Sequence, residues 1–362
     1  MKRKASWIVW VVLLCLVLGG CAPNAKVPVA TAAAETNQAA YQKFSGTFFG
    51  SFDTITTLIG YATEQKTFDE NFAMVSGLFA RYHQVFDAYN EYEGVNNLWY
   101  VNEHADEGPV RAEQELIDLV LWLKEKQPQT QGKVNVAMGK MLRVWHNYRS
   151  VGVALPSMEE LTAAAAHSDF DKVVVDKEAG TIHFTDPEML LDLGAVAKGY
   201  TVEIVAKALL DGDMPSFIIS AGGNVRSGEK PLDGRARWGI GIQDPAFPSA
   251  NKDVLYFKGL SAVTSGDYQR YYTVDGVNYH HLIDPATLMP GDYMRAVTVV
   301  TEDSGLADLL STTLFLMSVE EGKAFLEAYP EVEAYWVLHD GTVQYTDGMA
   351  AMLRSLGASA ND

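Results

Sequence analysis

The spacing of apolar and polar residues changes along the chain between a helical period and an alternating one. Apolar residues recur every three or four positions in several segments, which predicts helices at 68–86, 113–126, 135–149, 158–167, 195–210 and 306–317. The helix at 195–210 is rich in Ala, and the helix at 306–317 is apolar at nearly every position.

Alternating patterns predict strands between and after these helices. Residues 48–62 alternate apolar side chains with Thr and Gly, and residues 189–193 resemble the end of a buried strand. Asp275-Gly276 separates two alternating runs, 268–274 and 277–282, which is a strong hairpin signal. Further strands are expected at 172–175, 181–185, 216–220, 237–243, 254–257, 262–264, 295–301, 333–338 and 343–345. Helices mixed with successive hairpins indicate an α+β fold with packed helices on mostly antiparallel sheets.

The N-terminal residues have the pattern of an export signal. A basic start precedes an apolar segment, 7–18, which is too short to span a bilayer comfortably. Leu18-Gly19-Gly20-Cys21 resembles a bacterial lipobox, which implies that residues 1–20 are removed and Cys21 is lipidated. A simple membrane anchor is the alternative. We therefore expect an exported protein, lipid-anchored to the outer face of the bacterial cell membrane.

The rest of the chain divides into a tether, one domain and a short tail. Residues 21–43 carry the lipidated Cys and lack periodicity, which is typical of a flexible tether. One globular domain is expected at 44–356, with a tail at 357–362. The remaining cysteine, Cys15, lies in the removed segment, so the exported chain has no disulfide.

The charge of the chain restricts its partners. The formal net charge is −18, and it becomes −21 when the three cations of residues 1–20 are removed. Such acidity argues against nucleic acid as a partner.

Residues 191–200, Leu-Asp-Leu-Gly-Ala-Val-Ala-Lys-Gly-Tyr, combine an acid and a base where a strand is expected to become a helix. A helix that opens on Gly-Ala offers free N–H groups to an anion, and Lys198 adds positive charge one turn later. A carboxylate such as that of Asp192 is tolerated beside a phosphate site only if it holds a metal, binds a sugar or a base, or carries a proton. Alternatively, Asp192 only caps the helix and Lys198 is solvated.

Two further stretches carry polar residues at strand ends. Asn224 ends Ser-Ala-Gly-Gly-Asn, where glycines permit close approach to a ligand, although an ordinary tight turn is the alternative. His281 and Asp284 are three positions apart, which suits a base and its orienting partner. Alternatively, His280 and His281 simply face opposite sides of a strand.

The apolar helix at 306–317 contains two polar residues on one face. Asp308 and Thr312 are four positions apart, so their side chains lie on the same side. A buried carboxylate costs several kcal/mol unless it is paired or bound to a cation. A carboxylate with a hydroxyl suits a hard cation such as Mg²⁺. Alternatively, Asp308 faces solvent in the first turn of the helix.

Five motifs together resemble the ApbE family, the FAD:protein FMN transferases. They are Asp-Leu-Gly-Ala-Val-Ala-Lys-Gly-Tyr, Ala-Gly-Gly-Asn, Thr-Ser-Gly-Asp-Tyr, His-His-Leu-Ile-Asp-Pro and Ala-Asp-Leu-Leu-Ser-Thr-Thr, in the family's order. The resemblance runs from about Phe44 to the C-terminal helix. It implies an ApbE, T-fold-like architecture with an FAD site between sub-domains, and Mg²⁺-dependent transfer of FMN from FAD to a Ser or Thr hydroxyl of a client protein, releasing AMP.

The resemblance also implies roles for individual residues. The metal ligands would be Asp308, Thr312 and the backbone carbonyl of Ala195. His281 would deprotonate the acceptor hydroxyl, and Asp284 would support the site. The FAD contacts would be Phe49, Tyr89, Ala137, Met138, Gly139, Asp192, Lys198, Asn224, Ser265 and Leu282.

The chain departs from the family pattern at three places, and two other functions remain open. Phe49 stands where many relatives have Met, Asn135 where Asp is frequent, and 287–290 reads Thr-Leu-Met-Pro where Thr-Gly-x-Pro is usual. One alternative function is an FAD pyrophosphatase that gives FMN and AMP. The other is a non-catalytic flavin-binding lipoprotein.

Overall fold

The computed structural model describes residues 40–362. The expected signal peptide at 1–20, the lipidation site at Cys21 and nearly all of the expected tether lie outside the described residues. Within this range, the structure has no helix that is both long enough and apolar enough to cross a membrane.

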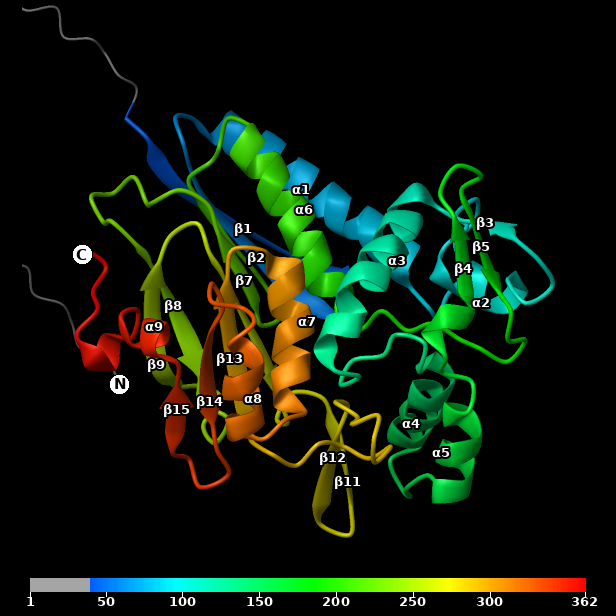
Figure 1. The fold of residues 1–362 in the computed structure, drawn as a ribbon. Coiled ribbons are helices and arrows are strands. Elements are labelled where there is room, and N and C mark those ends of the chain that lie inside the picture. The colour runs from blue at the N-terminus through cyan, green and yellow to red at the C-terminus, as the bar shows by residue number, and fades with distance from the viewer. Residues whose placement is uncertain (1–39) are drawn as a thin grey trace, which may run out of the picture. The chain divides into compact units, whose positions relative to one another are not determined.

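The core of the fold is an eight-stranded sheet in which every neighbouring pair of strands is antiparallel (Figure 1). In spatial order its strands are β1 (Gln42–Ser51), β2 (Thr54–Ala62), β6 (Phe217–Ala221), β7 (Asn224–Ser227), β10 (Ser261–Gly266), β13 (Ala296–Thr301), β14 (Glu333–Val337) and β15 (Val343–Tyr345). The α+β prediction with mostly antiparallel sheet is therefore confirmed.

The first hairpin corrects one sequence prediction. Residues 48–62 were expected as a single strand, but the chain reverses at Phe52 and Asp53, whose φ angles are 53° and 52°. Both values are left-handed, which matches the turn that twisted hairpins favour. The alternation continues on both sides of this reversal, so it does not reveal the turn.

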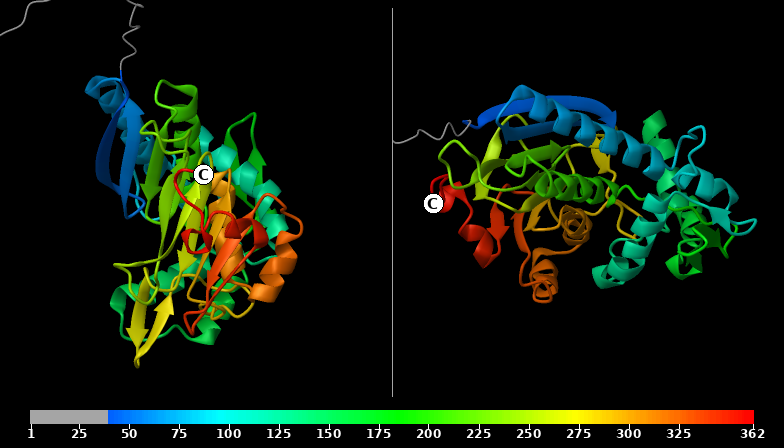
Figure 2. Two further views of the ribbon diagram at one scale, coloured as in Figure 1. Left: turned by 90° about the vertical axis from the view of Figure 1, so that its left-hand side faces the viewer. Right: turned by 90° about the horizontal axis from the view of Figure 1, so that it is seen from above.

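Helices cover one face of the sheet, and a hairpin with the C-terminal segment covers the other (Figures 1 and 2). Val297 and Trp336 point to the helical side, whereas Ala296 and Val337 point to the opposite side, as strand alternation requires. The helices are α1 (Gln65–Phe86), α6 (Ala197–Asp211), α7 (Ser304–Phe315) and α8 (Val319–Leu326). The opposite face carries β8 (Trp238–Gln243), β9 (Asn251–Phe257) and α9 (Asp347–Ala350).

A mainly helical lobe, whose apolar residues form two clusters, lies beside the sheet (Figure 1). Its elements are α2 (Leu98–His104), β3 (Val110–Arg111), α3 (Gln114–Lys126), α4 (Gly139–Val151), α5 (Met158–Ala165), β4 (Val173–Asp176) and β5 (Thr181–Phe184). The hairpin of β11 (Tyr271–Val274) and β12 (Val277–His280) projects below the sheet and packs against α4. Three short 3-10 turns lie at Gln127–Thr130, Phe170–Lys172 and Arg354–Leu356.

The structure also corrects the segments expected at 135–149 and 189–193. Helix α4 begins only at Gly139, and residues 189–193 form no strand beyond an isolated bridge between Met138 and Leu190. The N–H of Gly139 donates to the Leu190 carbonyl at 3.0 Å. A Cβ at Gly139 would lie 2.5 Å from that oxygen, so only glycine permits this approach.

The two ends of the described chain are held by backbone hydrogen bonds. Strand β1 begins at Gln42, within the expected tether. At the other end, the Ala360 carbonyl accepts from the N–H groups of Ala236 and Arg237 at 2.8 and 3.0 Å. The expected tail therefore lies against the segment that leads into β8.

A buried ion pair joins α6, β7 and the start of α7. Arg226 and Glu203 are 2% and 6% exposed, and Arg226 Nε lies 3.2 Å from Glu203 Oε2. The same oxygen accepts from the N–H of Ser304 at 2.9 Å. The pair therefore sets the position at which α7 begins.

We predict that Arg226→Met lowers the free energy of unfolding by about 3 kcal/mol, because it removes the buried partner of Glu203 and leaves only the exposed Lys207, whose Nζ lies 3.5 Å from Glu203 Oε1. Urea denaturation of the described domain measures this loss. The double variant Arg226→Met with Glu203→Gln should recover at least half of it, since no unpaired charge remains. A single variant as stable as the parent would contradict this assignment.

Candidate active site

The site is centred on Asp308, which lies where α7 meets the start of α6. Its side chain is buried, at 5% exposure, so the alternative of a solvent-facing first turn is wrong. Asp308 Oδ2 accepts from the Gly199 N–H at 2.8 Å and from Asn224 Nδ2 at 2.9 Å. Lys198 Nζ lies 4.0 Å from the same oxygen. All three interactions use one carboxylate oxygen, and among residues 40–362 no hydrogen bond or ion pair is formed with Oδ1.

The contact between Asp308 and Gly199 changes the first turn of α6. In a continuous helix the Gly199 N–H would reach the carbonyl of Ala195, four positions earlier. Here it donates to Asp308, and no backbone N–H of the described residues donates to the Ala195 carbonyl. A Cβ at Gly199 would lie 2.4 Å from Asp308 Cβ, so a larger residue would separate the two helices.

Three oxygen groups at this junction are therefore free to bind a hard cation. They are Asp308 Oδ1, the Ala195 carbonyl and the Thr312 hydroxyl, whose nearest hydrogen-bond partner is Ser265 Oγ at 3.5 Å. Among residues 40–362 there is no cluster of three or more His, Cys, Asp or Glu side chains that could hold a metal. One carboxylate with neutral oxygens fits Mg²⁺, which usually completes its shell with water and substrate phosphates.

Asp192 lies on the helical-lobe side of the site. Its Oδ1 accepts from the Gly194 N–H at 2.8 Å, and its Oδ2 accepts from the Tyr89 hydroxyl at 3.1 Å. Burial and the Asp192 carboxylate raise the pKa of Tyr89, which keeps the phenol a neutral donor. The Tyr89 ring stacks on His146, with centroids 4.7 Å apart, and is 45% exposed. A flat aromatic surface therefore stands next to Asp192.

Hydrogen bonds hold the loop before α4 against the segment that carries Asp192. The Asp192 N–H donates to the Val136 carbonyl at 2.9 Å, and the Ala137 N–H donates to Asn135 Oδ1 at 3.0 Å. The side chains of Ala137 and Met138 are buried, at 0% and 4% exposure. The loop of 137–139 can therefore meet a ligand mainly through its backbone.

His280 and His281 have different surroundings, as expected if the two side chains face opposite sides of a strand. His280 is buried, and its Nε2 lies 2.8 Å from the Gly291 carbonyl while its Nδ1 accepts from the Leu282 N–H at 3.2 Å. His281 remains partly exposed, and its Nδ1 lies 3.3 Å from the Arg270 carbonyl. Nδ1 is then the donor, which leaves Nε2 as a free acceptor.

The environment of His281 keeps its imidazole neutral. Burial and, to a smaller extent, the positive charges of Arg270 and Arg149 lower its pKa to about 3. The imidazole is therefore neutral at any pH near neutrality, and its Nε2 is an acceptor.

Asp284 does not orient His281 in this structure. Its buried carboxylate lies 3.3 Å from Lys133 Nζ and accepts from the Ala286 N–H at 2.9 Å. These bonds shape the turn of residues 284–289, in which Leu288 has a φ of 60°. Leu288 occupies the position where the family usually has glycine, so the departure places a branched side chain in a left-handed conformation.

The remaining predicted residues differ in exposure. Phe49 is 83% exposed and pairs across the first hairpin with Ile55, which is 65% exposed. Ser265 lies under α7, with its Oγ 2.9 Å from Ser311 Oγ. Leu282 is buried against the core of the sheet and α7. Asn224 supports Asp308 from β7, so its role here is to hold the carboxylate.

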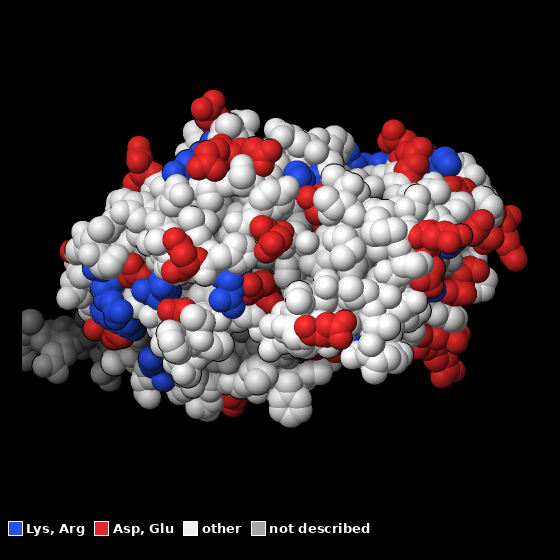
Figure 3. Space-filling model, turned by 90° about the horizontal axis from the view of Figure 1, so that it is seen from below, with Lys and Arg blue, Asp and Glu red and all other residues white. Residues whose placement is uncertain are grey.

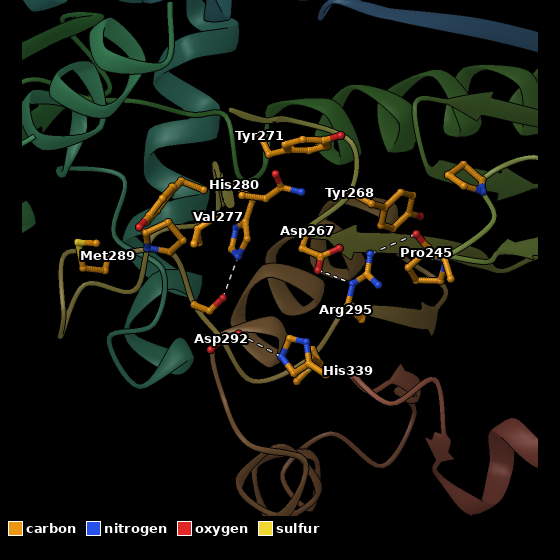
Figure 4. A pocket seen from close by; sticks show the side chains of 17 residues that line it. Pro245, Asp267, Tyr268, Tyr271, Val277, His280, Met289, Asp292, Arg295 and His339 are labelled. Atoms are coloured by element: carbon orange, nitrogen blue, oxygen red, sulfur yellow. Dashed lines mark hydrogen bonds and ion pairs between the residues drawn. The ribbon is translucent and has the colours of Figure 1, made fainter. Parts of the chain in front are cut away.

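A separate cavity of about 450 Å³ lies beside the β11–β12 hairpin, where His280 lines it (Figure 4). Its charged groups pair with one another: Arg295 Nε lies 2.5 Å from Asp267 Oδ2, and His339 Nε2 lies 3.2 Å from Asp292 Oδ1. The lining includes none of the predicted metal or FAD residues. The cavity therefore does not coincide with the centre around Asp308.

Sequence reasoning missed four residues around the site: His146, Arg149, Lys133 and Arg270. His146 and Arg149 lie on one face of α4, three positions apart, with Arg149 Nη2 3.3 Å from His146 Nδ1. Arg270 Nη2 donates to the Phe52 carbonyl at 3.2 Å and thereby ties the first hairpin to the residue that directly precedes β11. On α4, the sequence feature that could have indicated these residues is the polar pair His146 and Arg149, three positions apart and next to the buried Trp145.

Comparisons with known proteins agree with this geometry. The model of the ApbE family matches residues 52–336. An FAD:protein FMN transferase from Klebsiella pneumoniae is 29% identical over 77% of this chain and 87% of its own length. One from Treponema pallidum is 30% identical over 71% of this chain and 75% of its own length.

A solved structure agrees as well. The ApbE protein from Thermotoga maritima superposes with a TM-score of 0.77 at 25% identity, over 86% of this chain and 99% of that one. The fold, the match to the family model and the five motifs around Asp308 lead to one assignment: this chain belongs to the ApbE family.

Proposed function

We propose that this protein is an FAD:protein FMN transferase that uses Mg²⁺ and attaches FMN to a Ser or Thr hydroxyl of a client protein. The curated relatives are named FAD:protein FMN transferases. The observation that carries the proposal is the junction around Asp308, where a buried carboxylate keeps one oxygen free beside the Ala195 carbonyl and the Thr312 hydroxyl. Oxygen groups of this kind suit a cation that also binds a diphosphate.

The residues around this junction divide the work of binding FAD. Asp308, Thr312 and the Ala195 carbonyl would hold Mg²⁺, which supplies charge neutralisation on the phosphate oxygens when it is bound. Lys198 adds a fixed positive charge next to Asp308. Tyr89 and Asp192 present a flat ring and a hydrogen-bond acceptor that suit a base or sugar of the dinucleotide.

His281 moves the proton in the proposed reaction. The client's hydroxyl oxygen bonds to the phosphorus of the FMN half, and its proton passes to Nε2 of His281. The bond from that phosphorus to the AMP oxygen breaks, and AMP leaves with the electron pair. The Nδ1 contact with the Arg270 carbonyl keeps Nε2 free for this step.

The first 43 residues suggest where the reaction takes place. The basic and apolar start followed by Leu-Gly-Gly-Cys supports export and lipidation at Cys21. Such an anchor would hold the enzyme on the outer face of the cell membrane, next to exported or membrane-bound clients.

We predict that Asp308→Asn lowers Mg²⁺-dependent AMP release from FAD by about 100-fold or more, because a metal ligand loses its charge. The assay contains FAD, Mg²⁺ and a membrane extract of the host as the source of clients. The matched control is Asp303→Asn, which caps the same helix by accepting from the Leu306 N–H and can still do so as Asn. Undiminished turnover of the Asp308 variant would refute the metal assignment.

We predict that His281→Ala slows flavin transfer by about 100-fold or more while FAD binds nearly as tightly as before, because a base acts mainly in the transition state. Covalent flavin fluorescence on client proteins in a denaturing gel measures transfer, and quenching of FAD fluorescence measures binding. Equal losses in both would count against the base role. Free FMN without labelled protein, from the parent enzyme, would support the pyrophosphatase instead.

A further inference from the structure

The segment that carries Asp192 is extended but has a backbone neighbour on one edge only. On that edge lies the loop before α4: the Leu190 carbonyl accepts from the Gly139 N–H at 3.0 Å. The Asp192 N–H donates to the Val136 carbonyl of the same loop at 2.9 Å. Because backbone groups of successive residues in an extended chain point to opposite edges, those of Leu191 face the other way. No backbone group of residues 40–362 bonds to Leu191 there.

The side chain of Asn102 takes the place of the missing strand. Its Oδ1 accepts from the Leu191 N–H at 2.8 Å, and its Nδ2 donates to the Leu191 carbonyl at 2.9 Å. One amide thus forms the pair of hydrogen bonds that a residue of a neighbouring antiparallel strand would form. Asn102 is buried, at 7% exposure, and both ends of its amide are satisfied by this single backbone residue.

The two bonds at Leu191 also fix which side chain faces the site. Leu191 is buried in the core of the helical lobe. Because side chains alternate along an extended chain, Asp192 then points away from that core, toward Tyr89, whose hydroxyl donates to Asp192 Oδ2 at 3.1 Å. A slip of one residue would turn the Asp192 carboxylate into the apolar core. The amide of Asn102 opposes such a slip.

The helix that carries Asn102, α2, is a firm support for this contact. Val101 on the same helix is fully buried in the core of the lobe. The residue that caps the start of the helix, Asn97, is also fully buried, and its Nδ2 donates to the Asn90 carbonyl at 2.8 Å. Asn90 belongs to the turn that carries Tyr89. One short helix therefore holds both partners of the hydrogen bond between Tyr89 and the acid.

We propose that Asn102 is a positioning residue for FAD binding, which holds the Asp192 carboxylate where it meets the dinucleotide. This inference rests on the proposed function, in which Tyr89 and Asp192 meet a base or sugar of FAD. Asn102 has no polar atom left to offer a ligand, so it acts only through its neighbour. Its hydrogen bonds reach neither Asp308 nor His281. Loss of the amide should therefore weaken FAD binding and leave the chemical step nearly intact.

The test measures FAD binding by quenching of FAD fluorescence, without Mg²⁺ and without a client. Asn102→Ala should weaken FAD binding by about tenfold or more, because the displaced Asp192 carboxylate no longer makes its charge-assisted hydrogen bond to the ligand. Asn102→Asp keeps the acceptor for the Leu191 N–H and loses the donor, so its affinity should fall between the two. AMP release at saturating FAD and Mg²⁺ should stay within about twofold of the parent, since only uniform binding is lost.

A double-mutant cycle shows whether Asn102 acts through Asp192. Adding Asn102→Ala to Asp192→Ala should weaken FAD binding no further, because the two changes remove one interaction. The matched control is Asn71→Ala. Asn71 is also a buried asparagine, and its Nδ2 donates to the Thr67 carbonyl and to Asp213 Oδ1, both at 2.8 Å. This control should lower the melting temperature, as Asn102→Ala does, and leave FAD affinity unchanged.

Three results would overturn the positioning role. The first is an FAD affinity of Asn102→Ala equal to that of the parent. The second is a loss of affinity that multiplies with the loss in Asp192→Ala, which means that Asn102 acts elsewhere. The third is an equal loss in Asn71→Ala, which indicates general destabilisation. Because binding is measured without a client or turnover, failure of FMN transfer itself would leave these results readable.

Discussion

The burial of a single carboxylate at the junction of α6 and α7 is the constraint on which the site depends. At 5% exposure, Asp308 would cost several kcal/mol if it had no partners. The fold supplies a backbone N–H from Gly199, an amide from Asn224 and a nearby ammonium from Lys198, all at one oxygen. The other oxygen stays free, so the geometry that makes the charge tolerable also makes it available to a cation.

The contact between Gly199 and Asp308 also explains why α6 and α7 lie so close together. Gly199 has no side chain, and its N–H leaves the helical ladder to bond Asp308, which frees the Ala195 carbonyl. The buried pair of Arg226 and Glu203 holds the start of α7 against α6 through the Ser304 N–H. Neutral and ionic hydrogen bonds thus position the helices, while Asp308 Oδ1 and the Ala195 carbonyl have no hydrogen-bond partner among the described residues.

The site is completed by the two halves of the molecule. The sheet and its helices provide Asp308, Thr312 and Asn224, whereas the helical lobe provides Tyr89, Asp192 and the loop of 137–139. Acidic side chains gather on the end of the molecule formed by this lobe (Figure 3). The Arg270 carbonyl contacts His281, and the positive charges of Arg270 and Arg149 help to lower the pKa of His281 despite this acidity.

Periodicity by itself determined most of the helices, the hairpins and the α+β class, because apolar spacing directly records which face of an element is buried. The order of the motifs also indicated the family, with Asp308 and His281 as candidate site residues. Only the tertiary structure decided which oxygen of Asp308 is free, that Asp284 pairs with Lys133, and that the Arg270 carbonyl contacts His281. Apolar spacing also failed to predict the turn at Phe52 and Asp53, and it wrongly predicted a strand at 189–193. These features depend on contacts between residues far apart in the chain, and local spacing carries no record of them.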